Sequence, residues 1–216
     1  MILITLTLFS CNKKQTELEF EQAVLYEIFP QLVDSLHFDI RLSPPPPPMP
    51  IFDENQNLIG TDTTGMAKKQ VEYEKRKAEL QSDTKTLVIA IIDTTYSLEK
   101  KAQNELIKHF DNIELDTLNS KSNYKIDIEK LKTNGKWKFK PRSNFPTGRR
   151  LWKDEYDFHL AGTTWLSNIR FDKTKSFGIL ESGYGCGGLC GYSVRVFIYK
   201  KEGKWFIDEV FVTAVS

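Results

Sequence analysis

The stretch from Gly183 to Gly191 constrains the fold more than any other part of the chain. It reads Gly-Tyr-Gly-Cys-Gly-Gly-Leu-Cys-Gly, so five of the twelve glycines and two of the three cysteines fall within nine residues. Glycine enters positive-φ conformations without a steric cost. Because β-rich runs flank this stretch, we expect the chain to bend sharply here, with both thiols at the bend.

The runs around this loop predict an antiparallel meander. They are rich in β-branched and aromatic residues, and turn residues separate them at Asp172 to Lys175 and at Glu202-Gly203. The glycine–cysteine loop would then join the two middle strands. The four expected strands cover residues 164–171, 177–184, 192–199 and 205–213.

An earlier hairpin is predicted by Asn134-Gly135. Residues 124–129 alternate apolar and charged side chains, and Trp137 and Phe139 alternate with lysines after the turn. Asn-Gly between alternating runs is a strong hairpin signal. Gly-Lys-Trp occurs at both predicted hairpins, which fits either a distant duplication or common hairpin chemistry.

The N-terminal half contributes helices and one buried strand. Residues 17–36 have helical apolar spacing, with Thr16 as cap and a kink or break expected near Phe29 because Pro30 follows. Residues 66–82 form a charged, solvated helix, and Ser97 would cap another that ends at Phe110. The six apolar residues 87–92 predict a central strand. The fold class is therefore α+β: an antiparallel sheet with N-terminal helices packed on or beside it.

Five consecutive prolines, Pro44 to Pro48, divide the sequence. They predict an extended connector about 15 Å long, and residues 51–65 after them have the composition of an irregular exposed loop. We expect a signal peptide at 1–10, a tether and helix at 11–43, the connector and loop at 44–65, and an α+β domain at 66–216, with a possible subdivision near residue 120.

The N-terminus carries an uncharged apolar run, residues 2–9, which is too short to span a bilayer. Leu8-Phe9-Ser10-Cys11 resembles the lipobox of bacterial lipoproteins, although no Lys or Arg precedes the run. The resemblance implies cleavage before Cys11, acylation of its sulfur and anchoring to a membrane of the cell envelope. The alternative is an apolar strand or a disordered end that carries a chance cysteine.

The last fifty or so residues resemble a group of uncharacterised bacterial lipoproteins. The shared pattern is Ser-Asn-Ile-Arg-Phe-Asp-Lys at 167–173, Cys-Gly-Gly-Leu-Cys-Gly at 186–191, and Tyr-Lys-Lys-Glu-Gly-Lys-Trp-Phe-Ile at 199–207. This resemblance implies no activity, because the group has no assigned function.

In an oxidising envelope, Cys186 and Cys190 favour a structural disulfide. An extended chain would hold these cysteines roughly 13 Å apart at about 3.3 Å per residue, and Gly187-Gly188 permits the reversal that brings them together. Three other roles for the cysteines stay open: a redox couple, a metal site with His159 and either Asp157 or Glu181, and a thiol nucleophile with His159 as base. The glycine backbone could instead bind an anion.

Residues 131–153 contain eight basic residues and no acidic ones, with aromatic residues interleaved. The formal net charge is only +1, so an electrostatic partner would have to bind locally. Anionic lipid headgroups or acidic polysaccharide fit an envelope protein, whereas nucleic acid does not. A solvated strand face with its aromatics turned inward is the alternative. The anion-binding candidates are Lys138, Lys140, Arg149, Arg150 and Lys153.

Two functional hypotheses follow. The first is a lipid-anchored, non-catalytic binding or scaffolding module, with no cofactor or metal and with an unknown protein partner. The second is an envelope hydrolase, or a thiol- or metal-dependent enzyme, with a site near the glycine–cysteine loop. The sequence has no nucleophile elbow, P-loop or zinc-protease motif, which favours the first. The catalytic candidates of the second are His159, Glu181, Tyr184, Cys186 and Cys190.

Overall fold

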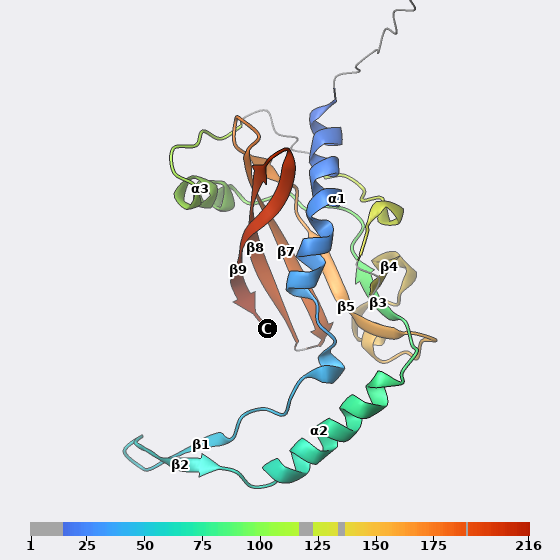
Figure 1. Ribbon diagram of the computed structural model, residues 1–216, viewed down its shortest axis with the longest axis vertical. Helices are drawn as coiled ribbons and strands as arrows, with labels where there is room; N and C mark the ends of the chain where they lie inside the picture. The colour runs from blue at the N-terminus through green and yellow to red at the C-terminus, as the bar shows by residue number, and fades with distance from the viewer. Residues whose placement is uncertain (1–14, 117–122, 134–136, 189) are drawn as a thin grey trace, which may run out of the picture.

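A computed structural model describes residues 15–116, 123–133, 137–188 and 190–216. Within these ranges the chain forms three α-helices, short 3-10 helices and two sheets (Figure 1). The helices are α1 (Glu17–Leu36), α2 (Met66–Gln81) and α3 (Lys100–His109), with 3-10 turns η1 (Ile40–Leu42), η2 (Ile128–Lys130), η3 (Arg142–Asn144) and η4 (Gly148–Trp152). The strands are β1 (Met49–Phe52), β2 (Leu58–Asp62), β3 (Leu87–Ile91), β4 (Trp137–Pro141), β5 (His159–Leu166), β6 (Arg170–Phe171), β7 (Phe177–Gly187), β8 (Cys190–Lys201) and β9 (Lys204–Val215).

The main sheet has seven strands in the order β4-β3-β5-β7-β8-β9, with β6 also paired to β7. The fold is α+β as predicted, but the sheet is mixed and not antiparallel throughout, because β3 runs parallel to both β4 and β5. A long connection through α3 separates β3 from β4, which is what a parallel pair requires. All five residues of β3 are buried, so the apolar run is the interior strand that the sequence predicts.

The predicted hairpin around Asn134-Gly135 is wrong, because its two strands do not pair with each other. The turn itself lies outside the described residues, but β4 pairs in parallel with β3 and not with residues 124–129. Those residues form a single bridge from Lys125 to Thr94 and then the 3-10 turn η2. The alternation of apolar and charged residues still indicates which side chains are buried, since Tyr124 and Ile126 are both in the core.

The C-terminal meander agrees with the prediction. β7 and β8 form a long antiparallel hairpin, and β8 and β9 form a second one that turns at Glu202-Gly203. Both turn residues have positive φ, 51° and 80°, which is the conformation that tight hairpin turns require. The turn that follows β6 is held by Asp172, whose carboxylate accepts the backbone N–H groups of Thr174, Ser176 and Phe177.

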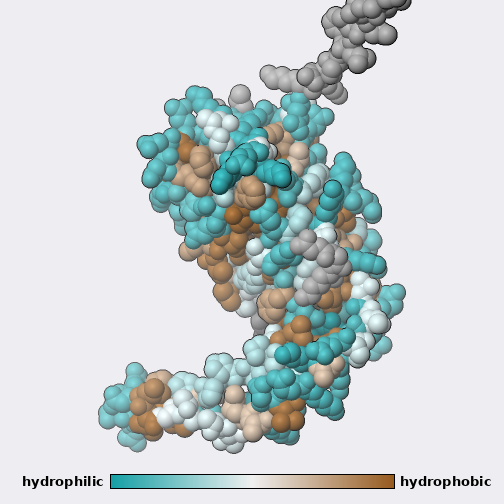
Figure 2. Space-filling view, viewed as in Figure 1, coloured by the Kyte–Doolittle hydropathy of each residue, from teal (hydrophilic) through white to brown (hydrophobic). Residues whose placement is uncertain are grey.

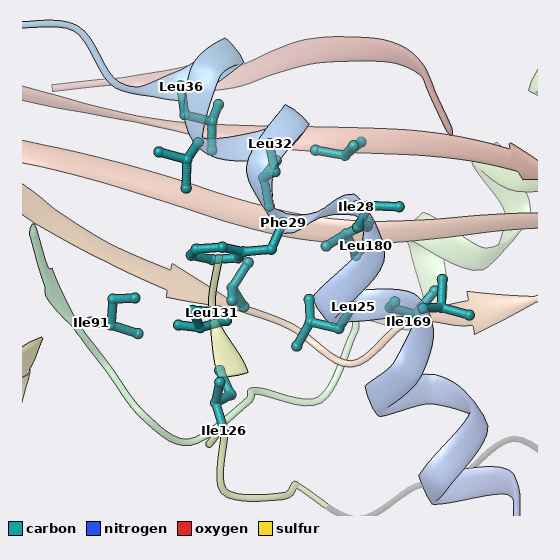
Figure 3. Close-up of a cluster of buried hydrophobic side chains, with 14 of the residues drawn as sticks. Leu25, Ile28, Phe29, Leu32, Leu36, Ile91, Ile126, Leu131, Ile169 and Leu180 are labelled. Atoms are coloured by element: carbon teal, nitrogen blue, oxygen red, sulfur yellow. The ribbon is translucent and has the colours of Figure 1, made fainter. Parts of the chain in front are cut away.

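Helix α1 packs across one face of the sheet and supplies much of the main core (Figure 3). Thr16 and Glu19 form the capping box at its start, which satisfies two of the backbone groups that a helix end leaves unpaired. The predicted break near Phe29 does not occur, because α1 continues through Pro30. We attribute this continuity to the packing on both sides of the proline. The buried apolar side chains of α1 are Val24, Leu25, Ile28, Phe29, Leu32, Val33 and Leu36.

Helix α3 packs on the opposite face of the sheet. Its apolar side chains Ala102 and Leu106 join Ile179 of β7 and Phe197 of β8 in a second, smaller core. The helix begins at Lys100, so the predicted cap at Ser97 is wrong; the Ser97 hydroxyl instead lies 2.9 Å from the Asn123 side-chain oxygen.

Residues 44–82 form an arm that projects from the body of the protein (Figure 1). The segment expected to be an irregular loop contains the β1–β2 hairpin, followed by α2, which has no buried residue and agrees with the predicted solvated helix. At the base of the arm the Arg41 guanidinium contacts both Asp39 and Asp83. One cation therefore ties together the two places where the arm leaves the body and returns.

The described part of the chain has no helix that is long and apolar enough to cross a membrane. The predicted signal peptide and Cys11 lie outside the described residues.

Candidate functional site

The sheet face opposite α1 is covered by α3 at β7 and β8 and by the segment that carries Phe145 and Leu151 at β3, and the surface between them is open. Beyond α3, side chains from three neighbouring strands share this face. The pairings place Trp165 opposite Gly183, Gly183 opposite Ser193, and Glu181 opposite Arg195. Residues paired directly across a sheet point to the same side. We call this surface, with Tyr96 beside it, the open sheet face.

Trp165 lies against the backbone of Gly183. A Cβ atom added to Gly183 would stand 2.2 Å from the indole Nε1 of Trp165, a distance that no real contact permits. The glycine is therefore required by this close approach. The ring of Tyr96 meets Trp165 edge-on, with centroids 5.9 Å apart, and Tyr96 remains 46% exposed.

The loop glycines have a different role from the one that the sequence suggests. The chain does turn between β7 and β8 as expected, but none of the described glycines between Gly183 and Gly191 has the expected positive φ. They allow close contact instead: a Cβ on Gly185 would lie 2.7 Å from Thr163 Oγ1, and one on Gly191 would lie 2.8 Å from the Tyr184 carbonyl oxygen. These glycines give the end of the open sheet face a floor without side chains.

A cross-strand ion pair stands beside Trp165. An Arg195 guanidinium nitrogen lies 2.8 Å from a Glu181 carboxylate oxygen, and these side chains are 14% and 19% exposed. The pair is therefore partly desolvated but still reaches the surface. It offers both a cation and an anion next to an aromatic ring.

Two hollows meet at Trp165. One, of about 330 Å³, is lined by Tyr96, Ser97, Glu99, Trp165 and Glu181. The other, of about 310 Å³, extends over the glycine floor toward Ser193 and Ser216 and also has Trp165 on its border. The indole thus borders both depressions, which is an arrangement suited to a ligand with a flat apolar face and polar edges.

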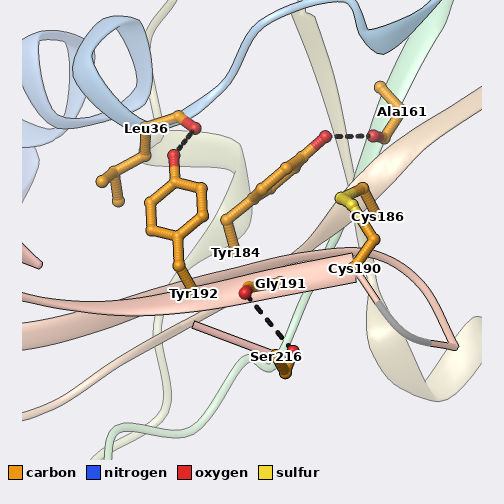
Figure 4. Close-up of a disulfide and its surroundings, with 8 residues drawn as sticks. All are labelled: Leu36, Ala161, Tyr184, Cys186, Cys190, Gly191, Tyr192 and Ser216. Carbon is orange, nitrogen blue, oxygen red and sulfur yellow. Dashed lines mark hydrogen bonds between the residues drawn. A yellow bond between two sulfur atoms is a disulfide. The ribbon is translucent and has the colours of Figure 1, made fainter. Parts of the chain in front are cut away.

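The predicted disulfide is present between Cys186 and Cys190, whose Cα atoms are 5.1 Å apart (Figure 4). It closes the β7–β8 hairpin at the end of the open sheet face. Among the described residues, no group of three or more His, Cys, Asp or Glu side chains is arranged to hold a metal ion.

The other catalytic candidates do not come together. Tyr184 projects to the α1 side, where its ring meets His37 at 4.7 Å and its hydroxyl donates to the Ala161 carbonyl at 2.9 Å (Figure 4). Burial raises the pKa of Tyr184 to about 12. Glu181 is on the opposite face of the same strand. Tyr184 and Cys190 both border the hollow over the glycine floor, but their polar atoms already have partners.

His159 begins β5, close to the base of the arm. Burial is the main cause that lowers the pKa of His159, and the neighbouring Arg41 cation lowers it further. Within the described ranges His159 forms no metal-holding group with the cysteines, and Asp157 is exposed outside any strand.

The basic segment has its aromatic residues turned inward, in agreement with the second of the two interpretations. Trp137 and Phe145 are buried, and Phe139 packs edge-on against Phe29 at 5.1 Å. The cations lie outside: Lys140 stands over the Phe158 ring at 4.1 Å, and Lys138 and Arg149 are exposed. Arg150 lies 3.4 Å from Asp154, so one of the candidate anion-binding cations already has an acidic neighbour.

Two buried ionisable groups were not predicted from the sequence. Glu21 of α1 is 2% exposed and accepts the Ile169 backbone N–H at 2.8 Å; burial raises the pKa of Glu21 to about 7. His37, just after α1, is buried with both ring nitrogens lacking a hydrogen bond among the described residues, and burial lowers the pKa of His37 to about 3. A charged residue on the apolar face of a predicted helix is the signal that could have identified Glu21.

Trp165 and Arg195 were also not singled out from the sequence. The available signal was a pair of opposite charges, Glu181 and Arg195, each in the middle of an otherwise apolar predicted strand. No family model matches the chain, and neither a curated protein nor a solved structure shows significant similarity to it. The candidate site therefore depends on its own geometry.

Proposed function

We propose that the protein is a lipid-anchored, non-catalytic binding module of the bacterial cell envelope that takes a saccharide on the open sheet face. The observation that carries the proposal is the Trp165 indole packed against Gly183 where two hollows meet. An aromatic ring packed against a glycine has already lost part of its rotamer freedom in the folded protein, so binding costs less side-chain entropy. Such a ring is a suitable platform for the apolar face of a sugar.

The polar surroundings support the same ligand class. Glu181 and Arg195 can receive hydroxyl or carboxylate groups at the edge of a sugar, and Tyr96 extends the aromatic surface. A partly buried ion pair beside an aromatic platform gives orientation as well as contact area. The separation of Tyr184 from Glu181 on opposite faces is what favours binding over the catalytic alternative.

Titration calorimetry with a panel of neutral and acidic oligosaccharides tests the ligand. We expect Trp165→Ala to weaken binding about tenfold, since aromatic stacking contributes about 1.5 kcal/mol at most. Trp152→Ala removes a partly buried tryptophan elsewhere and is the matched control. If no saccharide binds, or if Trp165→Ala binds as the wild type does, the proposal is wrong.

The anchor is proposed from Cys11 and the lipobox-like residues before it. Metabolic labelling with a fatty acid should mark the wild type and not Cys11→Ala, while Cys186→Ser should still be marked. Equal labelling of wild type and Cys11→Ala would exclude acylation at Cys11.

A further inference from the structure

The β1–β2 hairpin exposes nearly all of its apolar surface. Its large apolar side chains are between 44% and 74% exposed, and they form an apolar patch at the end of the arm (Figure 2). A two-stranded hairpin alone in water is marginally stable at best, so its apolar surface needs a covering partner. These side chains are Met49, Ile51, Phe52, Leu58 and Ile59.

The end of β9 is the complementary surface. In its first half, α1 covers the outer edge: Glu27 accepts the Trp205 N–H, and Gln31 accepts the Ile207 N–H. Among the described residues, none hydrogen-bonds the outer edge of the second half. Charged side chains and proline are usual means of protecting an edge strand. Residues 210–216 contain neither.

The apolar residues at this edge lie on both faces of the sheet. Phe211 pairs with Arg195 on the open sheet face, and Val212 pairs with Val194 on the α1 side; both are about half exposed, and Val215 is 80% exposed. In the hairpin, the adjacent Ile51 and Phe52 also point to opposite faces, because side chains alternate along a strand. Strand addition would continue both apolar faces at once.

The hairpin lies at the far end of the arm, away from β9 of its own chain (Figure 1). We infer that two copies of the chain exchange arms, so that the hairpin of each pairs with the open half of β9 of the other. Residues 44–65 contain Asp53, Glu54 and Asp62 and no cation, so two hairpins repel each other, whereas an uncharged β9 edge accepts one. A two-fold exchange satisfies both surfaces on both copies and closes at the dimer.

Each arm–edge contact brings the five exposed apolar side chains of the hairpin to the three at the end of β9. A two-fold dimer contains this contact twice. Pairing two β9 edges directly would leave both hairpins uncovered. The arm of the second copy is therefore the segment that pairs with the β9 edge.

Sedimentation analysis of the full chain, carrying Cys11→Ala so that no lipid is attached, tests the exchange. We expect a mass of twice 25.0 kDa. Phe52→Asp on the arm and Val212→Asp on the edge should each produce monomers, while Val71→Asp on the exposed side of α2 should remain dimeric. Val215→Asp gives a second edge variant if Val212→Asp fails to fold, as judged by circular dichroism.

Mixing the two monomeric variants separates arm exchange from other dimers. The arm-defective chain keeps a working edge and the edge-defective chain keeps a working arm, so the mixture should regain one of two contacts and form a weak heterodimer. A monomeric wild type, or a Phe52→Asp variant that stays dimeric, would overturn the inference. If the wild type is monomeric and binds vesicles, and Phe52→Asp loses that binding, the arm would be assigned to a membrane contact instead. Saccharide binding through Trp165 is measured separately on the same variants.

Discussion

Replacing Glu21 with glutamine should change how the stability of the protein depends on pH. Glu21 is buried in the main core, and its pKa rises from 4.5 to about 7 because burial disfavours the charged form. Below pH 4.5 the carboxyl is protonated in both the folded and unfolded states and costs nothing. Above pH 7 it is ionised in both, and the folded state bears the cost of the buried charge.

The pKa difference converts to about 3 kcal/mol at about 1.4 kcal/mol per pH unit. The contribution of Glu21 should therefore lower the free energy of unfolding of the wild type by about this amount as pH rises from 4.5 to 7. Glu21→Gln is neutral throughout and keeps an oxygen to accept the Ile169 N–H. We expect it to match the wild type near pH 4.5 and to be more stable by up to about 3 kcal/mol at pH 8.

Urea unfolding of both proteins at several pH values measures this difference. The His37 contribution has the opposite sign in an overlapping pH window, but it is present in both proteins and cancels in the comparison. Exposed Glu54→Gln is the matched control and should show no such pH dependence. If the wild-type and Glu21→Gln stabilities run parallel across the range, or if the glutamine variant is the less stable protein at pH 8, the reasoning about burial is wrong.

Four further changes test other parts of the structure. His37→Leu should reduce the loss of stability on acidification from pH 6.5 toward 3, because the folded-state pKa of His37 is about 3 and protonation therefore favours the unfolded chain; equal acid sensitivity would contradict this. Gly183→Ala should cost about 1–3 kcal/mol in chemical denaturation, since its Cβ would overlap Trp165, whereas Gly188→Ala, with open space around it, should cost little. Cys186→Ser with Cys190→Ser should lower the free energy of unfolding by about 2 kcal/mol, and the intact wild type should be two mass units lighter before reduction than after, which free thiols would refute. Neutralising Arg149, Arg150 and Lys153 should weaken pelleting with anionic vesicles; unchanged pelleting would leave these cations as a solvated surface.

Local sequence signals predicted the elements whose partners are close in the chain. The β7–β8 and β8–β9 hairpins follow from Glu202-Gly203 and from the loop that holds the cysteines. The interior position of β3 follows from the run of six apolar residues, 87–92, that contains it. Its parallel pairing with β4 and β5 was not predictable, because the strands are far apart in sequence and register depends on how α1 and α3 cover the two faces.

The candidate site was harder to predict than the fold. The contact between Trp165 and Gly183 joins two strands, and neither residue alone indicates it. Composition alone does not indicate the β1–β2 hairpin, because its strands are short and its turn depends on Asp53, whose carboxylate accepts the backbone N–H groups of Asn55 and Asn57. The unusual composition of residues 183–191 indicates the correct end of the sheet. It does not indicate that the glycines are there to permit close contacts and not positive φ.

The contact of Arg41 with Asp39 and Asp83 has a consequence for the modular construction of the chain. Because one side chain reaches both ends of residues 44–82, the whole excursion leaves and rejoins the body at almost the same point. It has the geometry of an insertion into a domain in which α1 would lead directly into β3. A short glycine-containing link between residues 43 and 83 should therefore give a smaller protein that still folds, and this site can accept other inserted sequences in place of the arm.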